Sequence, residues 1–308
     1  MHVYLNLGYN PQAGAGGAIG RELLDKIADV GFRGIRQDVP DDTGLTRDLV
    51  RELAGSPRLD VIFLIAGGHM TRPDGVPWEK QSLVRHVKET CEILASHGFF
   101  DRTTPPALEI GNEPDLAHSR FKHHPGDLAD TVRECYSAIR EFSENSPVLT
   151  PSVSNLNERG LSYLRRMLDR GVPEGASIAV HRYPKGRSPS DPHDPYDTRD
   201  DEVAALLSLV GGRDVWVTET GRSEGPGWVR RFLFQKTEFW LTEEEVADYM
   251  EAELRIWARF PRVKALVWYQ LNSGSNRRDE LHNYGIRRVD GTFKPIAERF
   301  TSVIQEVA

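Results

Sequence analysis

Apolar and polar positions follow two periods along the chain, and these periods alternate eight times. Short runs rich in Val, Ile and Leu, typical of strands buried on both faces, are each followed by a segment with apolar residues three or four positions apart, typical of a helix. The run at 60–66 is the clearest strand. The other predicted strands are 3–7, 34–39, 108–113, 148–153, 177–184, 215–221 and 263–270. The predicted helices are 19–30, 45–54, 81–97, 128–143, 161–170, 202–210, 242–258 and 294–306.

Eight strand–helix repeats predict an α/β fold with a parallel sheet, closed as a single (β/α)8 TIM barrel. No linker, low-complexity tract or charge block divides the chain, so we expect one catalytic domain over residues 1–308. Catalytic groups of such barrels sit at the carboxyl ends of the strands. The polar and aromatic residues at or near these ends are Arg36, His69, Asn112, Glu113, His181, Tyr183, Glu219 and Trp268.

Composition narrows the class of protein. A net charge of -7 argues against a general nucleic-acid partner. No run approaches the roughly 18 apolar residues of a membrane helix and the chain starts almost directly in a strand, so we expect no membrane partner and a cytoplasmic location. A trimmed secretion signal would leave the same sequence. Cys91 and Cys135 fit buried reduced thiols better than a disulfide framework or a metal site.

Two glutamates each close a predicted strand. Glu113 lies between Asn112 and Pro114, where proline forces the chain to leave the sheet, and Glu219 ends the apolar run that begins at Val215. Enzymes that cleave glycosides flank the bond with two carboxyl groups, and a pair only about 5–5.5 Å apart lets one attack directly, with retention of configuration. The fourth and seventh strands of an eight-stranded barrel face each other across it. The pair therefore predicts glycoside cleavage.

These motifs give the chain a family resemblance. Asn112-Glu113-Pro114 and the run Thr218–Gly221 resemble those of the clan A retaining glycoside hydrolases, in particular family 5, and the resemblance covers the whole barrel. It implies that Glu113 is the acid/base, that Glu219 is the nucleophile and that Asn112 binds the sugar 2-hydroxyl. It also implies substrate-site roles for Arg36 (holding the nucleophile), His69, His181, Tyr183 and Trp268 (an apolar floor for the sugar).

The resemblance implies a retaining β-glycoside hydrolase that acts on an oligo- or polysaccharide, with no cofactor and no metal. One departure from the family is the polar pair Gln37-Asp38 after Arg36, which leaves the shape near the nucleophile open. Glu109 would also face inward, and we interpret it as a buried partner for Arg36. The sequence does not reveal the sugar and linkage, endo or exo action, or the oligomeric state.

Three other functions compete with this interpretation. A transglycosidase would pass the same glycosyl intermediate to a sugar, and a non-hydrolytic barrel would only bind carbohydrate. A nicotinamide-dependent oxidoreductase is less favoured. Its glycine fingerprint is mimicked by the cluster from Gly14 to Gly20, with Asp38 at the end of the second strand. However, Ile19 occupies the place of the third glycine, and this interpretation leaves both strand-end glutamates unexplained.

Histidines and arginines in the loops suggest two further possibilities. A metal-dependent hydrolase would need ligands from His118, His123, His124 and His193, but these lack ligand spacing on one element, and we interpret them as solvated. Arginines after the seventh and eighth strands, among them Arg230 and Arg277, suggest an acidic or substituted glycan, because guanidinium groups suit carboxylate and sulfate.

Overall fold

The computed structural model describes residues 1–7, 20–66, 80–117, 119–183, 199–224, 227–232, 235–239, 241–273 and 283–307. Eight strands pair in parallel: β1 (His2–Asn6), β2 (Gly34–Asp38), β3 (Asp60–Ile65), β4 (Ala107–Ile110), β5 (Val148–Leu149), β6 (Ile178–Arg182), β7 (Val215–Thr220) and β10 (Val263–Tyr269). Their order in the sheet is β5-β4-β3-β2-β1-β10-β7-β6. Backbone hydrogen bonds from Thr150 to Ser177 and from His181 to Val153 join β5 to β6, so the sheet nearly closes on itself. The predicted single (β/α)8 barrel is confirmed.

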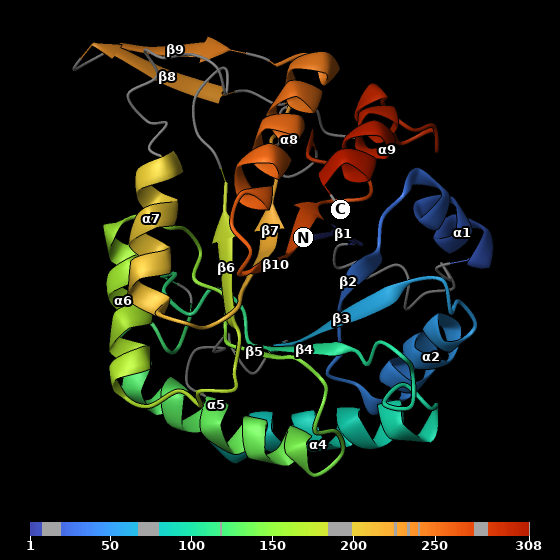
Figure 1. Ribbon diagram of the computed structural model, residues 1–308, viewed down its shortest axis with the longest axis vertical. Coiled ribbons are helices and arrows are strands. Elements are labelled where there is room, and N and C mark those ends of the chain that lie inside the picture. The colour runs from blue at the N-terminus through green and yellow to red at the C-terminus, as the bar shows by residue number, and fades with distance from the viewer. Residues whose placement is uncertain are drawn as a thin grey trace.

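The helices lie around the outside of the strands (Figure 1). They are α1 (Arg21–Val30), α2 (Thr43–Ala54), α4 (Lys80–Ser96), α5 (Pro125–Arg140), α6 (Glu158–Asp169), α7 (Arg199–Val210), α8 (Glu243–Ala258) and α9 (Pro295–Val307). Side-chain caps fix several starts: Asp42 accepts from the Leu45 amide, and Thr242 and Glu245 form a capping box. No helix in these described ranges is both long and apolar enough to cross a membrane.

Two elements differ from those predicted. The strand predicted over 148–153 is regular only at Val148–Leu149, because Pro151 has no amide hydrogen for the ladder; Ser152 and Val153 keep single bridges to the neighbouring strands. The long segment after β7 holds an antiparallel hairpin, β8 (Gly227–Phe232) and β9 (Gln235–Phe239), which the sequence did not predict.

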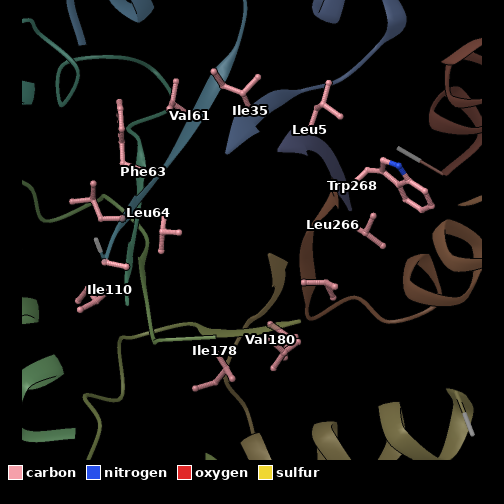
Figure 2. Packing of buried hydrophobic residues seen from close by; sticks show 14 of the residues in the cluster. Leu5, Ile35, Val61, Phe63, Leu64, Ile110, Ile178, Val180, Leu266 and Trp268 are labelled. Atoms are coloured by element: carbon pink, nitrogen blue, oxygen red, sulfur yellow. The ribbon is translucent and has the colours of Figure 1, made fainter. Parts of the chain in front are cut away.

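The barrel wall has an outer core and an inner core. Outward residues of the strands pack against the helices, as Leu5, Ile35 and Val180 do in Figure 2. The inner core fills the barrel interior below the carboxyl ends of the strands. It consists of Tyr4, Ile62, Ala107, Leu149, Ala179, Trp216, Ala265 and Val267. Gly34 makes room for Tyr4, because a Cβ there would lie 2.5 Å from the tyrosine ring. Toward the carboxyl ends of the strands, the interior becomes polar.

The two cysteines belong to the outer core. Cys91 on α4 and Cys135 on α5 are both buried and free. Burial raises the pKa of the Cys91 thiol to about 12, so this thiol stays protonated at neutral pH. The interpretation of both cysteines as buried reduced thiols is confirmed.

Candidate active site

Glu113 sits on an unusual backbone at the end of β4. Gly111 has a φ of 85° and Glu113 a φ of 45°, so both adopt the left-handed region. For a glutamate this conformation costs about 1–2 kcal/mol and persists only where the surroundings enforce it. The Glu113 amide donates to the Ser152 carbonyl at 2.9 Å, and Pro114 behind it is buried. The chain thus turns out of the sheet and leaves the Glu113 side chain 22% exposed at the end of the barrel.

Glu219 reaches the interior through an irregularity in β7. Val217 pairs with Val180 but Glu219 pairs with His181, so β7 has one residue more than its neighbour at this point. The same extra residue appears against β10. Such a bulge resets the alternation of side chains and re-aims the residues beside it. As a result, Thr218 and Glu219 both reach the polar interior, where Thr218 donates to Glu109 at 2.9 Å and Glu219 accepts from Arg36 at 2.7 Å.

Arg36 organises the polar layer from the centre. Its side chain is 1% exposed, and its Nε donates to Glu109 Oε2 at 2.6 Å. One terminal nitrogen donates to Glu219 Oε1 at 2.7 Å and the other to Asn112 Oδ1 at 3.1 Å. The guanidinium fork suits this arrangement because its donors are rigid and permanently charged. The predicted pairing of Glu109 with Arg36 is confirmed, and so is the predicted contact between Arg36 and Glu219.

Strand β6 brings two further predicted residues to the glutamates. The Tyr183 hydroxyl donates to Glu219 Oε2 at 2.5 Å. His181 Nδ1 lies 3.0 Å from Glu113 Oε1 and 3.5 Å from Glu219 Oε2. Arg182, between them in sequence, points the other way and forms a buried ion pair with Glu253 on α8 at 2.5 Å. Alternation along the strand therefore places His181 and Tyr183 on the inner face.

The contacts set the charges of the site. Burial by itself raises the pKa of Glu219, but His181, Arg36 and the Tyr183 hydrogen bond outweigh it, and the net pKa is lowered. Burial lowers the pKa of His181, yet the two glutamates outweigh that and raise it. The pKa of Tyr183 is raised by burial and by Glu219, so its hydroxyl keeps its proton and can only donate to that carboxylate. Glu219 is thus an oriented anion.

Trp268 does not join this group, and the prediction that it forms the floor of the site is wrong. Figure 2 shows Trp268 and Leu266 on the side of β10 that faces the helices, and the Trp268 ring lies 5.7 Å from the ring of Phe300 on α9. Because Ala265 and Val267 face the interior, the next inward residue is Tyr269.

Tyr284 is a site residue that sequence reasoning missed, and Tyr269 is one that the alternation along the last strand left undecided against Trp268. The Tyr269 ring lies 6.1 Å from that of Tyr183 and 5.7 Å from that of Tyr284. Gly221 accommodates them: a Cβ there would lie 2.5 Å from the Tyr269 carbonyl oxygen and 3.0 Å from the Tyr284 ring. A charged residue in the same strand could have indicated which side faces outward. Lys264 is exposed and lies on the same side of the strand as Trp268, so Tyr269 lies on the opposite, inward side.

Several predicted residues lie outside what the structure describes. His69, His118, His193, Arg277 and most of the glycine cluster fall outside the described residues. Arg230 lies on β8, whose side chains are likewise outside the description. His123 and His124 are described and exposed, in agreement with their interpretation as solvated loop residues.

One set of groups within the described ranges has the geometry to hold a metal ion. Glu113, His181 and Glu219 each offer an atom, and these atoms lie within 4.8 Å of one another. The surroundings fit a cation poorly, because Arg36 and Tyr183 already donate to the two oxygens of Glu219. The positive charge of Arg36, 2.7 Å from the Glu219 carboxylate, repels a metal cation from the same carboxylate. The arrangement instead suits chemistry carried out by the carboxyl groups themselves.

Comparison with protein families identifies the class of enzyme. A family model described as the glycosyl hydrolase catalytic core matches residues 78–298. The chain belongs to this family. The protein is therefore a glycoside hydrolase, as the two strand-end glutamates predicted. A comparison with curated proteins found no match.

Solved structures of other glycoside hydrolases share the fold. A family 5, subfamily 18 enzyme from Streptomyces cattleya, in complex with GlcNAc, has 17% identity and a TM-score of 0.69, over 99% of this chain and 80% of that one. A fungal β-1,4-galactanase has 13% identity and a TM-score of 0.71, over 98% and 99%. The Thermotoga maritima endoglucanase has 15% identity and a TM-score of 0.66, over 98% and 96%. The predicted resemblance to clan A glycoside hydrolases is confirmed.

Proposed function

We propose that this glycoside hydrolase cleaves β-linked glycans with net retention, with Glu219 as nucleophile and Glu113 as acid/base. The observation that carries the proposal is the approach of the two side chains: a carboxylate oxygen of Glu113 and one of Glu219 lie within 4.8 Å. Inverting enzymes hold their carboxyl groups about 6.5–9.5 Å apart to leave room for a water, whereas retaining enzymes hold them about 5–5.5 Å apart. The separation fits direct attack.

The surroundings of the two glutamates favour different roles in a two-step reaction. Glu219 attacks the anomeric carbon while Glu113 gives its proton to the departing oxygen, which leaves a glycosyl ester on Glu219. Glu113 then takes a proton from water, and this water breaks the ester and frees Glu219. The lowered pKa of Glu219 supports the nucleophile role, because the attacking group must be ionised. His181 links the pair through its contacts of 3.0 and 3.5 Å.

The neighbouring residues supply contacts for the sugar. Asn112 Oδ1 already accepts from Arg36 and from Ser152, so its amide NH2 is the group oriented to donate to a hydroxyl. Tyr269 and Tyr284, which flank Tyr183, replace Trp268 as the aromatic surface for the C–H face of a pyranose. The substrate is an oligo- or polysaccharide, the class of compound on which the galactanase and the endoglucanase act by name.

The stereochemistry of the first product tests this mechanism. Proton NMR during hydrolysis of an aryl β-glycoside is expected to show the β-anomer first and the α-anomer only later, through mutarotation. Two displacements at one carbon restore the original configuration. An α-anomer formed first would contradict the nucleophilic role of Glu219. Residual activity after dialysis against EDTA is expected to equal that of the untreated enzyme.

Tyr183→Phe is expected to lower kcat about 10- to 100-fold, because a donor to the reacting carboxylate is lost. The hydrogen bond from Tyr183 is one of the contacts that lower the pKa of Glu219, so the acid limb of the kcat/KM profile should move to higher pH. Tyr163→Phe is the matched control, since its buried hydroxyl donates to the Phe121 carbonyl at 2.8 Å, outside the site. It should lower stability alone; an equal loss of kcat in both variants would contradict the assignment.

A further inference from the structure

Asp38 is a carboxyl group at the site that the proposed mechanism does not use. It is the last residue of β2, two positions after Arg36, so the two side chains share a face of the strand. Arg36 points into the barrel, where it meets Glu109 and Glu219. Asp38 therefore faces the interior one step closer to the carboxyl end. Its side chain is partly buried and keeps some contact with solvent.

Among the described residues, none forms an ion pair with Asp38. In the part of the chain that the structure describes, no side chain or backbone group forms a hydrogen bond with its carboxyl group. Each of the three guanidinium nitrogens of Arg36 is instead directed to another partner: Glu109, Glu219 or Asn112. Burial raises the pKa of Asp38 to about 6; Arg36 opposes this, and Glu219 and Glu109 add to it. Its charge also contributes to the raised pKa of Tyr269 on β10. Near neutral pH the ionised Asp38 thus adds a negative charge to a site where Arg36 already faces both Glu109 and Glu219.

We propose that Asp38 determines specificity: its carboxylate accepts a hydrogen bond from a hydroxyl group of the sugar bound next to Glu219, and its charge excludes a sugar carboxylate from that position. This inference rests on the proposed function. A partly buried carboxylate without a donor is unfavourable, and a sugar hydroxyl supplies the donor that the protein lacks. A sugar lacking that hydroxyl leaves the carboxylate unpaired, so the site discriminates between sugars.

The exclusion follows from the charges around the same position. A uronic acid bound there would bring a third carboxylate beside Asp38 and Glu219, while Arg36 is already shared between Glu219 and Glu109. Repulsion between like charges is strong in a partly buried site. The sugar unit next to Glu219 is therefore neutral. If the glycan carries acidic groups, as the loop arginines suggested from sequence, they bind at other positions.

Kinetics on paired substrates test the inference. Asp38→Asn and the control Asp41→Asn, an exposed aspartate three residues further on, would be assayed with aryl β-glucoside and β-galactoside and with the corresponding β-uronides. The wild type is expected to prefer the neutral member of each pair. Asp38→Asn should lower kcat/KM on the neutral substrate about 10- to 100-fold. The ratio of kcat/KM on the neutral substrate to that on the uronide should fall at least about tenfold. An unchanged preference overturns the proposal, whether both rates fall together or neither does.

Calorimetric binding of unreactive methyl 1-thio-β-glycosides and their uronic counterparts gives the same comparison without turnover. The preference for the neutral ligand, and its narrowing in Asp38→Asn, should appear in Kd. If no aryl glycoside is hydrolysed but this binding pattern holds, the proposed function fails and the role of Asp38 stands. If hydrolysis requires Glu113 and Glu219 but Asp38→Asn has the same ratio of Kd values for neutral and uronic ligands as the wild type, the proposed function stands and this inference is wrong.

The melting temperature of Asp38→Asn also tests the proposal, because replacing an aspartate that the protein itself stabilises would lower Tm, whereas replacing an unpaired one should raise it. The pKa of Asp38 is raised to about 6 in the folded protein, so its ionisation disfavours folding progressively above the ordinary aspartate pKa and fully above pH 6. Asp38→Asn should therefore raise Tm by about 2–4 °C at pH 8 and leave it nearly unchanged at pH 4. A fall in Tm at pH 8 would mean that the protein itself satisfies the carboxylate, and would overturn the proposal.

Discussion

Glu219→Gly is expected to lower kcat about 10⁴- to 10⁶-fold while the barrel stays folded, because the variant lacks the group that attacks the anomeric carbon. Glycine also leaves a space beside Arg36 that a small anion can enter. Azide should enter this space and attack the anomeric carbon, while Glu113 protonates the departing oxygen. A single displacement inverts the configuration, so the product from an aryl β-glycoside should be an α-glycosyl azide, identified by NMR.

Glu113→Ala should respond to azide in the opposite stereochemical sense. Here Glu219 still forms the glycosyl ester from substrates with a good leaving group, and azide attacks that ester, giving a β-glycosyl azide. Glu174→Gly, which alters an exposed glutamate in the segment between α6 and β6, is the control and should match the wild type. An α-azide from Glu113→Ala together with a β-azide from Glu219→Gly would exchange the two roles. Normal turnover by either site variant would contradict the two-glutamate mechanism.

The sequence predicted the barrel because the two periods of its apolar residues alternate without interruption. Buried parallel strands appear as continuous apolar runs, and all their carboxyl ends lie at one end of the barrel. Placing Glu113 and Glu219 at such ends therefore predicted that they lie at the same end of the barrel, within reach of each other. Glu109 followed from the same reasoning, since it precedes the end of β4 on an inward position and pairs with Arg36 at 2.6 Å.

Other features of the site depend on neighbours that a single sequence does not show. The run from Ala265 to Tyr269 is apolar on both faces, so alternation alone did not decide between Trp268 and Tyr269. The inward turn of Glu219 depends on a bulge, which exists only in the pairing of β7 with β6 and β10. That Asp38 lacks a hydrogen-bond partner among the described residues is visible only in the structure, where each guanidinium nitrogen of Arg36 is directed to another residue.

Arg36→Met is expected to lower the free energy of unfolding at pH 7 by about 3–5 kcal/mol, the usual cost of removing one partner from a buried ion pair. Arg36 and Glu109 are 1% and 0% exposed, and the Glu219 side chain is 11% exposed, so water replaces the lost guanidinium poorly. Arg36 is among the groups that lower the pKa of Glu219, so that pKa should rise in the variant. Urea unfolding at pH 7 and pH 5 measures the difference.

The pH dependence separates this electrostatic cost from a simple loss of packing. Near pH 5 Glu219, whose pKa should rise in the variant, takes up a proton more readily in the folded state, so the deficit relative to the wild type should shrink. A packing defect would cost the same at both pH values. Adding Glu109→Gln to Arg36→Met removes one of the two buried charges and should recover part of the stability without recovering kcat. Arg33→Met, which breaks a pair with Asp60 in which the arginine is 49% exposed, should cost less than about 1 kcal/mol. A deficit that is independent of pH and unaffected by Glu109→Gln would refute the view that Arg36 holds two carboxylates in one buried layer.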